Sequence, residues 1–227
     1  MSNYLALYRK YRPQTFDQVV GQDHIVSLLK TSVAQGSISH AYLFCGGRGT
    51  GKTSVARILA KALDTNDEDV IEIDAASHRG IDDIRSLREA VMTMPFSSNY
   101  KVYIIDEAHM LTKEASNALL KTLEEPPAHV IFILATTDPE KLPITIVSRC
   151  QKIIFSSPDI PTLAKQLMFV AKEEGRVLSE EVAVLIAKHT GHSYRDGLGM
   201  LEQVLLLSKK NEITPEVVAT FFGTPDE

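Results

Sequence analysis

The most constraining feature of this 227-residue chain is a glycine-rich segment, residues 46–53, which reads Gly-Gly-Arg-Gly-Thr-Gly-Lys-Thr. A short apolar run, Ala41–Cys45, precedes it, and a run with helical apolar spacing follows it as far as Leu63. A strand, a glycine loop and a helix in this order are typical of the P-loop, where backbone N–H groups and a helix N-terminus face a phosphate group. The segment therefore predicts a nucleotide-binding site on an α/β fold.

The residue types of the P-loop indicate how it would bind its ligand. The Lys52 ammonium would reach the β and γ phosphates, and the Thr53 hydroxyl would hold Mg²⁺. We expect ATP or ADP together with Mg²⁺ as ligands. The expected contacts are Gly47, Arg48, Gly49, Thr50, Gly51, Lys52, Thr53 and Ser54.

A pair of acidic residues ends another apolar run. Residues 102–105 are Val-Tyr-Ile-Ile, and Asp106 and Glu107 follow them. On its own this pattern favours a solvated strand end, but here a complete P-loop precedes it in the chain. At the carboxyl edge of a parallel sheet both acids would serve one site. We predict that Asp106 supports Mg²⁺ and that Glu107 is a base that polarises the attacking water.

Three further polar residues carry weaker signals. Thr137 follows the apolar run at 130–135, where it would touch the γ-phosphate or cap a turn, and spacing alone leaves both alternatives open. Arg149 and Arg195 would each stabilise negative charge on a phosphate group, or be a solvated or ion-paired surface group.

The order of the elements predicts two domains. Short apolar runs alternate with helical runs, which indicates a five-stranded parallel sheet flanked by helices. The expected strands are 41–45, 70–73, 102–105, 130–135 and 152–155. We assign residues 1–156 to this P-loop ATPase domain. Residues 8–16 are expected to form an ordered arm rather than a helix, because Pro13 biases Arg12 towards extended backbone.

After a turn cluster at 156–161 the pattern becomes helical, and no strand is expected. We predict a small all-helical domain over residues 157–227. Its helices would span 161–175, 179–191 with Ser179 as N-cap, 195–207, and a segment that begins at Thr214 and Pro215.

Composition narrows the class of protein. The net charge is −5, so a nucleic-acid surface would have to be a local basic patch. Arg79, Arg85 and Arg88 are candidates for such a patch, and a solvated helix face is the alternative. No apolar run approaches the roughly 20 residues of a membrane span. The two cysteines, Cys45 and Cys150, fit a reducing cytosol, so we expect a cytoplasmic protein.

A set of segments along nearly the whole chain carries a family resemblance. They are Tyr11-Arg-Pro-Gln-Thr-Phe16, Val20-Gly-Gln22, residues 46–53, Glu72-Ile-Asp-Ala-Ala-Ser77, Asp106-Glu-Ala-His-Met-Leu111, Asn117-Ala-Leu-Leu-Lys-Thr-Leu-Glu-Glu-Pro-Pro127, Ala135-Thr-Thr-Asp-Pro139 and Ser148-Arg-Cys150. The sequence thereby resembles the AAA+ clamp-loader ATPases, and most of all their bacterial gamma/tau branch, which serves DNA polymerase III. The Leu-Glu-Glu-Pro-Pro and Ser-Arg-Cys segments are the more specific part, since the P-loop is shared by many families.

The resemblance implies further roles and partners. It puts Thr137 at the sensor-1 position, Arg149 at the arginine finger that acts on a neighbouring subunit's ATP, and Arg195 at sensor 2 in the lid domain. It implies an adenine border of Tyr8, Arg12, Pro13 and Val20. The family works as a hetero-pentamer that binds a sliding clamp and primer–template DNA, and a single subunit is expected to hydrolyse ATP slowly.

The chain also departs from the family pattern. Relatives usually carry a four-cysteine zinc module where residues 64–69 here read Asp-Thr-Asn-Asp-Glu-Asp, so no zinc site is expected. The scattered histidines, such as His109, are interpreted as surface or structural groups. The chain stops where the family continues into a helical collar, so we expect a fragment or short relative that is monomeric or weakly self-associating. Gly197 and Gly199 would each cost about 1 kcal/mol inside the sensor-2 helix.

Two alternatives stay open at this point. One is a different AAA+ motor, such as a branch-migration helicase, and the Leu-Glu-Glu-Pro-Pro and Ser-Arg-Cys segments argue against it. The other is a clamp-loader subunit that binds nucleotide without hydrolysing it. The intact Gly51-Lys52-Thr53 and Asp106-Glu107 argue against that.

Overall fold

The computed structural model describes residues 4–78, 80–207, 212–213 and 218. The chain forms two compact units. The sheet unit comprises Pro13–Gly46 and Gly51–Phe155, and the helical unit comprises Met1–Arg12, Gly47–Thr50 and Ser156–Glu227. No helix among the described residues is long and apolar enough to cross a membrane.

The sheet unit is built on five parallel strands in the order β2-β3-β4-β1-β5. This confirms the predicted five-stranded parallel sheet. Strands β4 and β1 are buried along their whole length, because helices cover both faces of the sheet. The strands are β1 Ala41–Cys45, β2 Val70–Asp74, β3 Lys101–Asp106, β4 Val130–Thr136 and β5 Gln151–Ile154.

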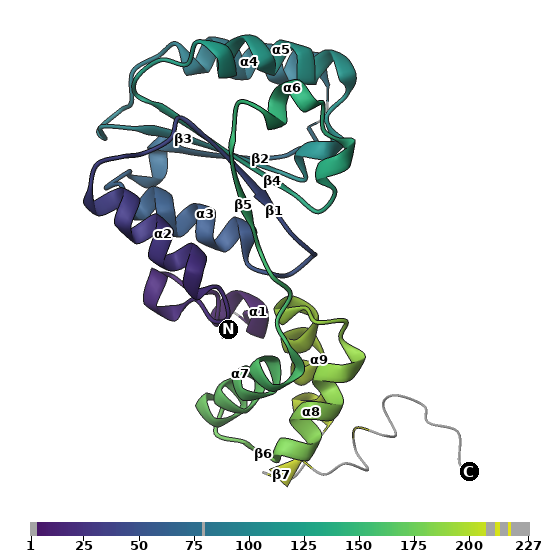
Figure 1. The fold of residues 1–227 in the computed structure, drawn as a ribbon. Helices are drawn as coiled ribbons and strands as arrows, with labels where there is room; N and C mark the ends of the chain where they lie inside the picture. The colour runs from purple at the N-terminus through teal and green to yellow at the C-terminus, as the bar shows by residue number, and fades with distance from the viewer. Residues whose placement is uncertain (1–3, 79, 208–211, 214–217, 219–227) are drawn as a thin grey trace. The chain divides into compact units, whose positions relative to one another are not determined.

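Successive side chains of each strand point to opposite faces of the sheet, so the core is divided into two layers. Tyr42 and Phe44 of β1 join the cluster that contains Leu59, whereas Leu43 joins the cluster that contains Leu119. Figure 1 shows α2 and α3 on one face of the sheet and α4, α5 and α6 on the other. The helices are α2 Asp23–Ala34, α3 Lys52–Ala62, α4 Ile81–Val91, α5 Lys113–Glu124 and α6 Ile144–Val147, with 3₁₀ turns η1 Phe16–Gln18, η2 Asp67–Asp69, η3 Ala108–Met110 and η4 Pro139–Lys141.

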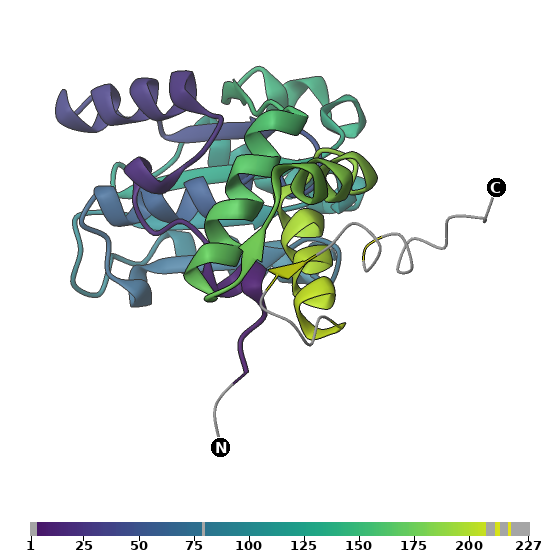
Figure 2. The same cartoon turned by 90° about the horizontal axis from the view of Figure 1, so that it is seen from below.

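The helical unit has its own apolar core. The Asp159 carboxylate accepts a hydrogen bond from the Thr162 N–H at 2.8 Å and caps α7, and Ser179 caps α8 as predicted. The short α1 lies beside α9, where the Leu7 N–H donates to the Glu202 carboxylate at 3.1 Å (Figures 1 and 2). The elements are α1 Leu7–Lys10, α7 Ile160–Glu173, α8 Glu180–His189, α9 Tyr194–Leu207, β6 Val177–Leu178 and β7 Glu212–Ile213.

Two local expectations were wrong. The arm at residues 8–16 begins as a helix, α1, because Pro13 restricts only Arg12 and the helical turn already ends at Tyr11. A pair of two-residue strands, β6 and β7, follows Phe155 although no strand was expected. A two-residue strand is too short to give a periodic pattern. The expected helix at Thr214 and Pro215 lies outside the described residues.

One of the two unusual glycines in α9 has a packing reason. A Cβ added at Gly197 would lie 3.2 Å from Leu163 Cδ1 of α7, whereas a Cβ at Gly199 would meet no atom within 4 Å. Gly197 therefore permits a close approach of α7 and α9, and the local packing does not require Gly199.

Candidate functional site

The backbone at the end of β1, where the P-loop begins, is tightly constrained by its neighbours. The Gly46 N–H donates to the Thr136 carbonyl at 3.2 Å, and the Phe155 N–H donates to the Cys45 carbonyl at 2.7 Å. A Cβ at Gly46 would lie only 2.6 Å from the Phe155 carbonyl oxygen. Only glycine fits here, because the opposing carbonyl oxygen and Cβ of Phe155 are fixed by the backbone and cannot rotate away.

The start of α3 places Lys52 inside the sheet unit. Gly51 has φ +100° and is the N-cap of α3, so a glycine makes the sharp entry into the helix possible. Lys52 is only 6% exposed, and its Nζ donates to the Gly46 carbonyl at 2.8 Å. Burial lowers the pKa of Lys52, although Glu107 and Asp106 oppose the shift. A buried cation of this kind fits an anionic ligand.

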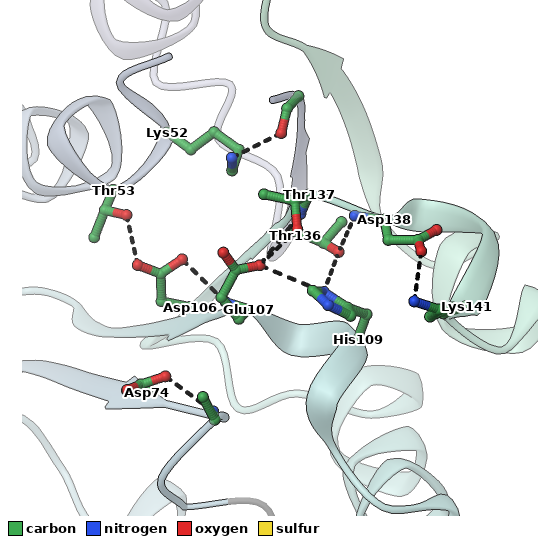
Figure 3. Close-up of polar contacts among 12 residues, drawn as sticks. Lys52, Thr53, Asp74, Asp106, Glu107, His109, Thr136, Thr137, Asp138 and Lys141 are labelled. Atoms are coloured by element: carbon green, nitrogen blue, oxygen red, sulfur yellow. Dashed lines mark hydrogen bonds and ion pairs between the residues drawn. The ribbon is translucent and has the colours of Figure 1, made fainter. Parts of the chain in front are cut away.

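Thr53 and Asp106 meet at the carboxyl end of the sheet. The Thr53 hydroxyl donates to Asp106 Oδ2 at 2.7 Å, and the Glu107 N–H donates to Asp106 Oδ1 at 3.0 Å (Figure 3). Hydroxyl and carboxylate oxygens are ligands that Mg²⁺ prefers, usually with phosphate oxygens and waters completing its shell. The donor set therefore fits nucleotide-bound Mg²⁺. Among the described residues, no group of three or more His, Cys, Asp or Glu side chains is placed to hold a metal ion.

Glu107 occupies an unusual backbone conformation. Its φ is +47°, in the left-handed region that non-glycine residues rarely adopt. Its Oε2 accepts hydrogen bonds from the Thr137 hydroxyl at 3.0 Å and the Thr137 N–H at 3.4 Å. Strained residues cluster at functional sites, where the surrounding structure holds them in place. Glu107 and Thr137 are thus brought together from the ends of β3 and β4.

The predicted arginine finger is held by its own unit. Arg149 donates to the Glu124 carboxylate at 2.6 Å and to the Thr145 carbonyl at 2.7 Å. These contacts fix the guanidinium between the end of α5 and α6. The described contacts of Arg149 do not include Asp106 or Glu107.

The helical unit holds the remaining predicted residues. The Arg195 guanidinium lies 5.0 Å from the centre of the Tyr8 ring, at cation–π distance. The Tyr194 N–H donates to the Gly49 carbonyl at 3.2 Å, and the Thr50 hydroxyl donates to the Gly47 carbonyl at 2.9 Å. Arg48 and Arg195 are exposed, and Arg12 is partly buried.

Two expected adenine contacts and one P-loop residue belong to the sheet unit. Pro13 and Ser54 are partly buried, and Val20 is 37% exposed. Their adenine or phosphate contacts stay predictions. The DNA candidates also stay predictions: Arg85 pairs with Asp82 of its own helix, Arg88 lies in the last turn of α4, and Arg79 lies outside the described residues.

Sequence reasoning missed a side chain beside Glu107. His109 was interpreted as a surface or structural group, but its Nδ1 lies 2.9 Å from Thr136 Oγ1 and 3.4 Å from Glu107 Oε2 (Figure 3). The η3 turn folds the chain back after β3, which brings His109 towards the end of β4. The Asp-Glu-Ala-His spacing could have signalled this only if the turn had been foreseen.

Comparisons with known proteins point to one family. A family model described as the DNA polymerase III delta subunit matches residues 21–76 and 64–159. The chain is 46% identical to DNA polymerase III subunit tau of Bacillus subtilis, with 91% of this chain and 40% of that protein covered. It is 42% identical to subunit tau of Escherichia coli, with 99% and 38% covered. It is also 42% identical to subunit gamma/tau of Mycobacterium tuberculosis, with 98% and 42% covered.

The alignments also show how this chain differs in length from its relatives. The chain spans about two fifths of the length of the relatives it matches. The alignment with the Escherichia coli protein runs over 246 positions, whereas this chain has 227 residues. The difference, 246 − 227 = 19, means that the relative has at least 19 residues in that stretch with no counterpart here.

Solved structures add information on the fold. The Holliday junction branch migration motor RuvB of Thermotoga maritima matches with a TM-score of 0.78 at 21% identity, over 94% of this chain and 72% of that chain. A solved point variant of the same motor matches with the same values. At this identity the likeness concerns the fold alone.

Proposed function

The chain belongs to the DNA polymerase III tau/gamma family, and on this premise we propose that it is the ATP-hydrolysing motor of a clamp loader. The observation that carries the proposal is the convergence of Lys52, Thr53, Asp106, Glu107 and Thr137 in the sheet unit. Each comes from the end of a strand or from the helix after the P-loop, where nucleotides bind in open α/β sheets.

Nucleotide binding would rest on the P-loop and the start of α3. Backbone N–H groups of residues 47–52 supply donors for phosphate oxygens, and the helix N-terminus favours an anion. Lys52, now bonded to the Gly46 carbonyl, would turn its ammonium to the β and γ phosphates. Thr53 and Asp106 would hold Mg²⁺, which supplies charge neutralisation on the phosphates when bound.

Hydrolysis would depend on Glu107 and Thr137. The Glu107 carboxylate would orient and polarise the water that attacks the γ-phosphate. Thr137 bonds to Glu107 in this structure, so exchange of that hydroxyl between the carboxylate and the γ-phosphate would report nucleotide state to the base. Arg195 would add charge from the helical unit, and Arg149 would complete a neighbouring subunit's site.

The proposed partners are those of a replication assembly: other clamp-loader subunits, a sliding clamp and primer–template DNA, in the cytoplasm. An exposed apolar group supports a protein partner. Met92, Met94 and Phe96 lie at alternate positions between α4 and β3 and are 67%, 72% and 82% exposed. Exposed large apolar side chains that gather in one segment are typical of protein contacts. We propose that this segment contacts another protein of the assembly.

The alternatives receive less support. The likeness to a branch migration motor concerns a fold that many functions share, whereas the relatives at 42–46% identity are DNA polymerase III subunits. A non-hydrolysing subunit would have no need for a base, whereas here Thr137 holds the Glu107 carboxylate beside Asp106.

Glu107→Gln tests the proposal. This variant should bind ATP as tightly as the parent but lose turnover by roughly 100-fold or more, because an amide cannot accept the water's proton. Glu89→Gln, an exposed glutamate on α4, is the matched control and should leave turnover unchanged. Nucleotide binding is measured by titration and turnover by phosphate release in the complete assembly. Equal turnover of parent and Glu107→Gln would refute ATP hydrolysis at this site.

A further inference from the structure

A histidine that the proposed chemistry does not use lies against its central carboxylate. His109 belongs to η3, two residues after Glu107, and its side chain is 11% exposed. Its Nδ1 lies 2.9 Å from Thr136 Oγ1 and 3.4 Å from Glu107 Oε2. An imidazole held this tightly beside a candidate base can affect how that base is oriented.

The local fold explains how the contact arises. Glu107 takes a left-handed conformation directly after β3, and the Met110 N–H then closes a turn onto the Glu107 carbonyl at 2.8 Å. The turn brings His109 back towards β4, which is the hydrogen-bonded neighbour of β3. The strained Glu107 backbone and the position of His109 are therefore parts of one arrangement.

The hydrogen-bond acceptors around the His109 ring indicate which ring nitrogen carries the hydrogen. A Glu107 carboxylate oxygen can only accept, so an Nδ1 lone pair facing it would be repelled. Thr136 Oγ1 already accepts the Asp138 N–H at 3.0 Å and can accept a second donor. With hydrogen on Nδ1, His109 donates to Thr136 Oγ1 and faces Glu107 Oε2 favourably. This tautomer follows from the hydrogen-bond network.

Thr137 and His109 contact the same carboxylate oxygen of Glu107. Thr137 Oγ1 donates to Glu107 Oε2, the oxygen that His109 also approaches. Figure 3 shows these contacts converging on one oxygen of Glu107 while the other oxygen points away from His109. One oxygen is thus anchored, and the second is left to face a reactant.

We propose that His109 is a positioning residue that, with Thr136, fixes the Glu107 carboxylate so that its second oxygen can orient the attacking water. This inference rests on the proposed ATP hydrolysis at Glu107. Thr137 must release Glu107 if its hydroxyl turns to the γ-phosphate. His109 then remains as the contact that keeps the carboxylate in place during turnover.

Substitutions at His109 separate positioning from folding. His109→Leu removes the donor and should lower kcat by roughly 10- to 100-fold, since a misplaced reactive group costs about that much. The Kd for ATP should stay unchanged, because the described polar contacts of His109 are with Thr136 and Glu107 and not with residues of the P-loop. His109→Asn puts an amide N–H near the position of Nδ1 and should retain most activity. His109→Gln puts its amide farther from the backbone and should behave like His109→Leu.

The experiment uses the full-length protein assembled with its partner subunits, clamp and primed DNA. Steady-state kcat, single-turnover ATP hydrolysis and ATP Kd are measured for the parent, the three His109 variants and Glu107→Gln. A lowered kcat for His109→Leu and His109→Gln, with rescue by His109→Asn, supports the proposal. If His109→Leu does not fold, the comparison of the asparagine and glutamine variants decides.

The experiment distinguishes a failure of the proposed function from a failure of the role proposed for His109. Normal turnover by Glu107→Gln would overturn the proposed function itself. A strong loss in Glu107→Gln together with normal kcat in His109→Gln, or with equal loss in His109→Asn and His109→Gln, would overturn only the role of His109. A change in ATP Kd without a change in kcat would likewise contradict positioning of the base.

Discussion

Replacing Gly46 by alanine should disturb the P-loop through one steric contact. The added Cβ would lie 2.6 Å from the Phe155 carbonyl oxygen and 2.8 Å from the Phe155 Cβ. Real Cβ atoms essentially never approach within 3.0 Å, so the two backbones must separate by at least 3.0 − 2.6 = 0.4 Å. The hydrogen bonds that Gly46 and Phe155 make to neighbouring strands resist this separation.

The expected cost follows from this geometry. Overpacking a well-ordered site typically costs about 1–3 kcal/mol, and here no rotamer change can relieve it. Because Lys52 and the phosphate-facing N–H groups follow Gly46 in the chain, a displaced loop should also bind ATP more weakly. We expect a loss of roughly tenfold in affinity, which corresponds to about 1.4 kcal/mol.

The assay pairs urea unfolding with ATP titration. Gly199→Ala is the matched control, because a Cβ there meets no atom within 4 Å and the residue lies inside α9. It should stabilise the protein by roughly 0.5–1 kcal/mol through helix propensity and leave ATP affinity unchanged. Parent-like stability and ATP affinity in Gly46→Ala would refute the argument from close approach.

Three further predictions concern buried and paired groups. Tyr103→Phe should leave stability unchanged or raise it by up to about 1 kcal/mol in thermal unfolding, because the buried Tyr103 hydroxyl has no partner among the described residues. Burial alone would raise the pKa of the Asp69 carboxyl group, but hydrogen bonds from three backbone N–H groups outweigh burial, so its pKa is lowered. Asp69→Asn should therefore reduce the free energy of unfolding by about 1–3 kcal/mol at neutral pH. The difference between the parent and the variant should vanish as the pH falls through the lowered pKa. Glu124→Gln should remove the ion pair of Arg149 and leave its hydrogen bond to the Thr145 carbonyl. The less firmly held guanidinium should lower ATP turnover only in the assembled complex, with less than about 1 kcal/mol lost in stability. Glu125→Gln serves as the control.

Much of the sheet unit could be predicted because its signals are local. The apolar run Ala41–Cys45 before a P-loop allows few other structures, and the observed strands differ from the predicted ones by at most one residue at either end. The pairing of Thr53 with Asp106 also follows, since parallel strands bring their carboxyl ends to one edge. Sequence order and strand direction were sufficient for this part.

The remaining features depend on tertiary contacts. The place of His109 depends on the left-handed backbone of Glu107, which no residue type signals because glutamate rarely adopts it. Whether Gly197 has a packing role depends on the approach of Leu163 from another helix. The ion pair of Arg149 with Glu124 joins residues 25 positions apart, and spacing alone could not separate it from a solvated arginine.

ATP hydrolysis by this chain alone and in a complete assembly is the most direct test of the account. Phosphate release is measured first with the isolated chain, and then with primed DNA, a sliding clamp and collar-containing partner subunits, each with the parent and with Arg149→Ala. We expect slow hydrolysis by the isolated chain, stimulation only in the assembly, and loss of that stimulation in Arg149→Ala. Vigorous hydrolysis by the isolated chain, unaffected by Arg149→Ala, would contradict a motor completed by its neighbours.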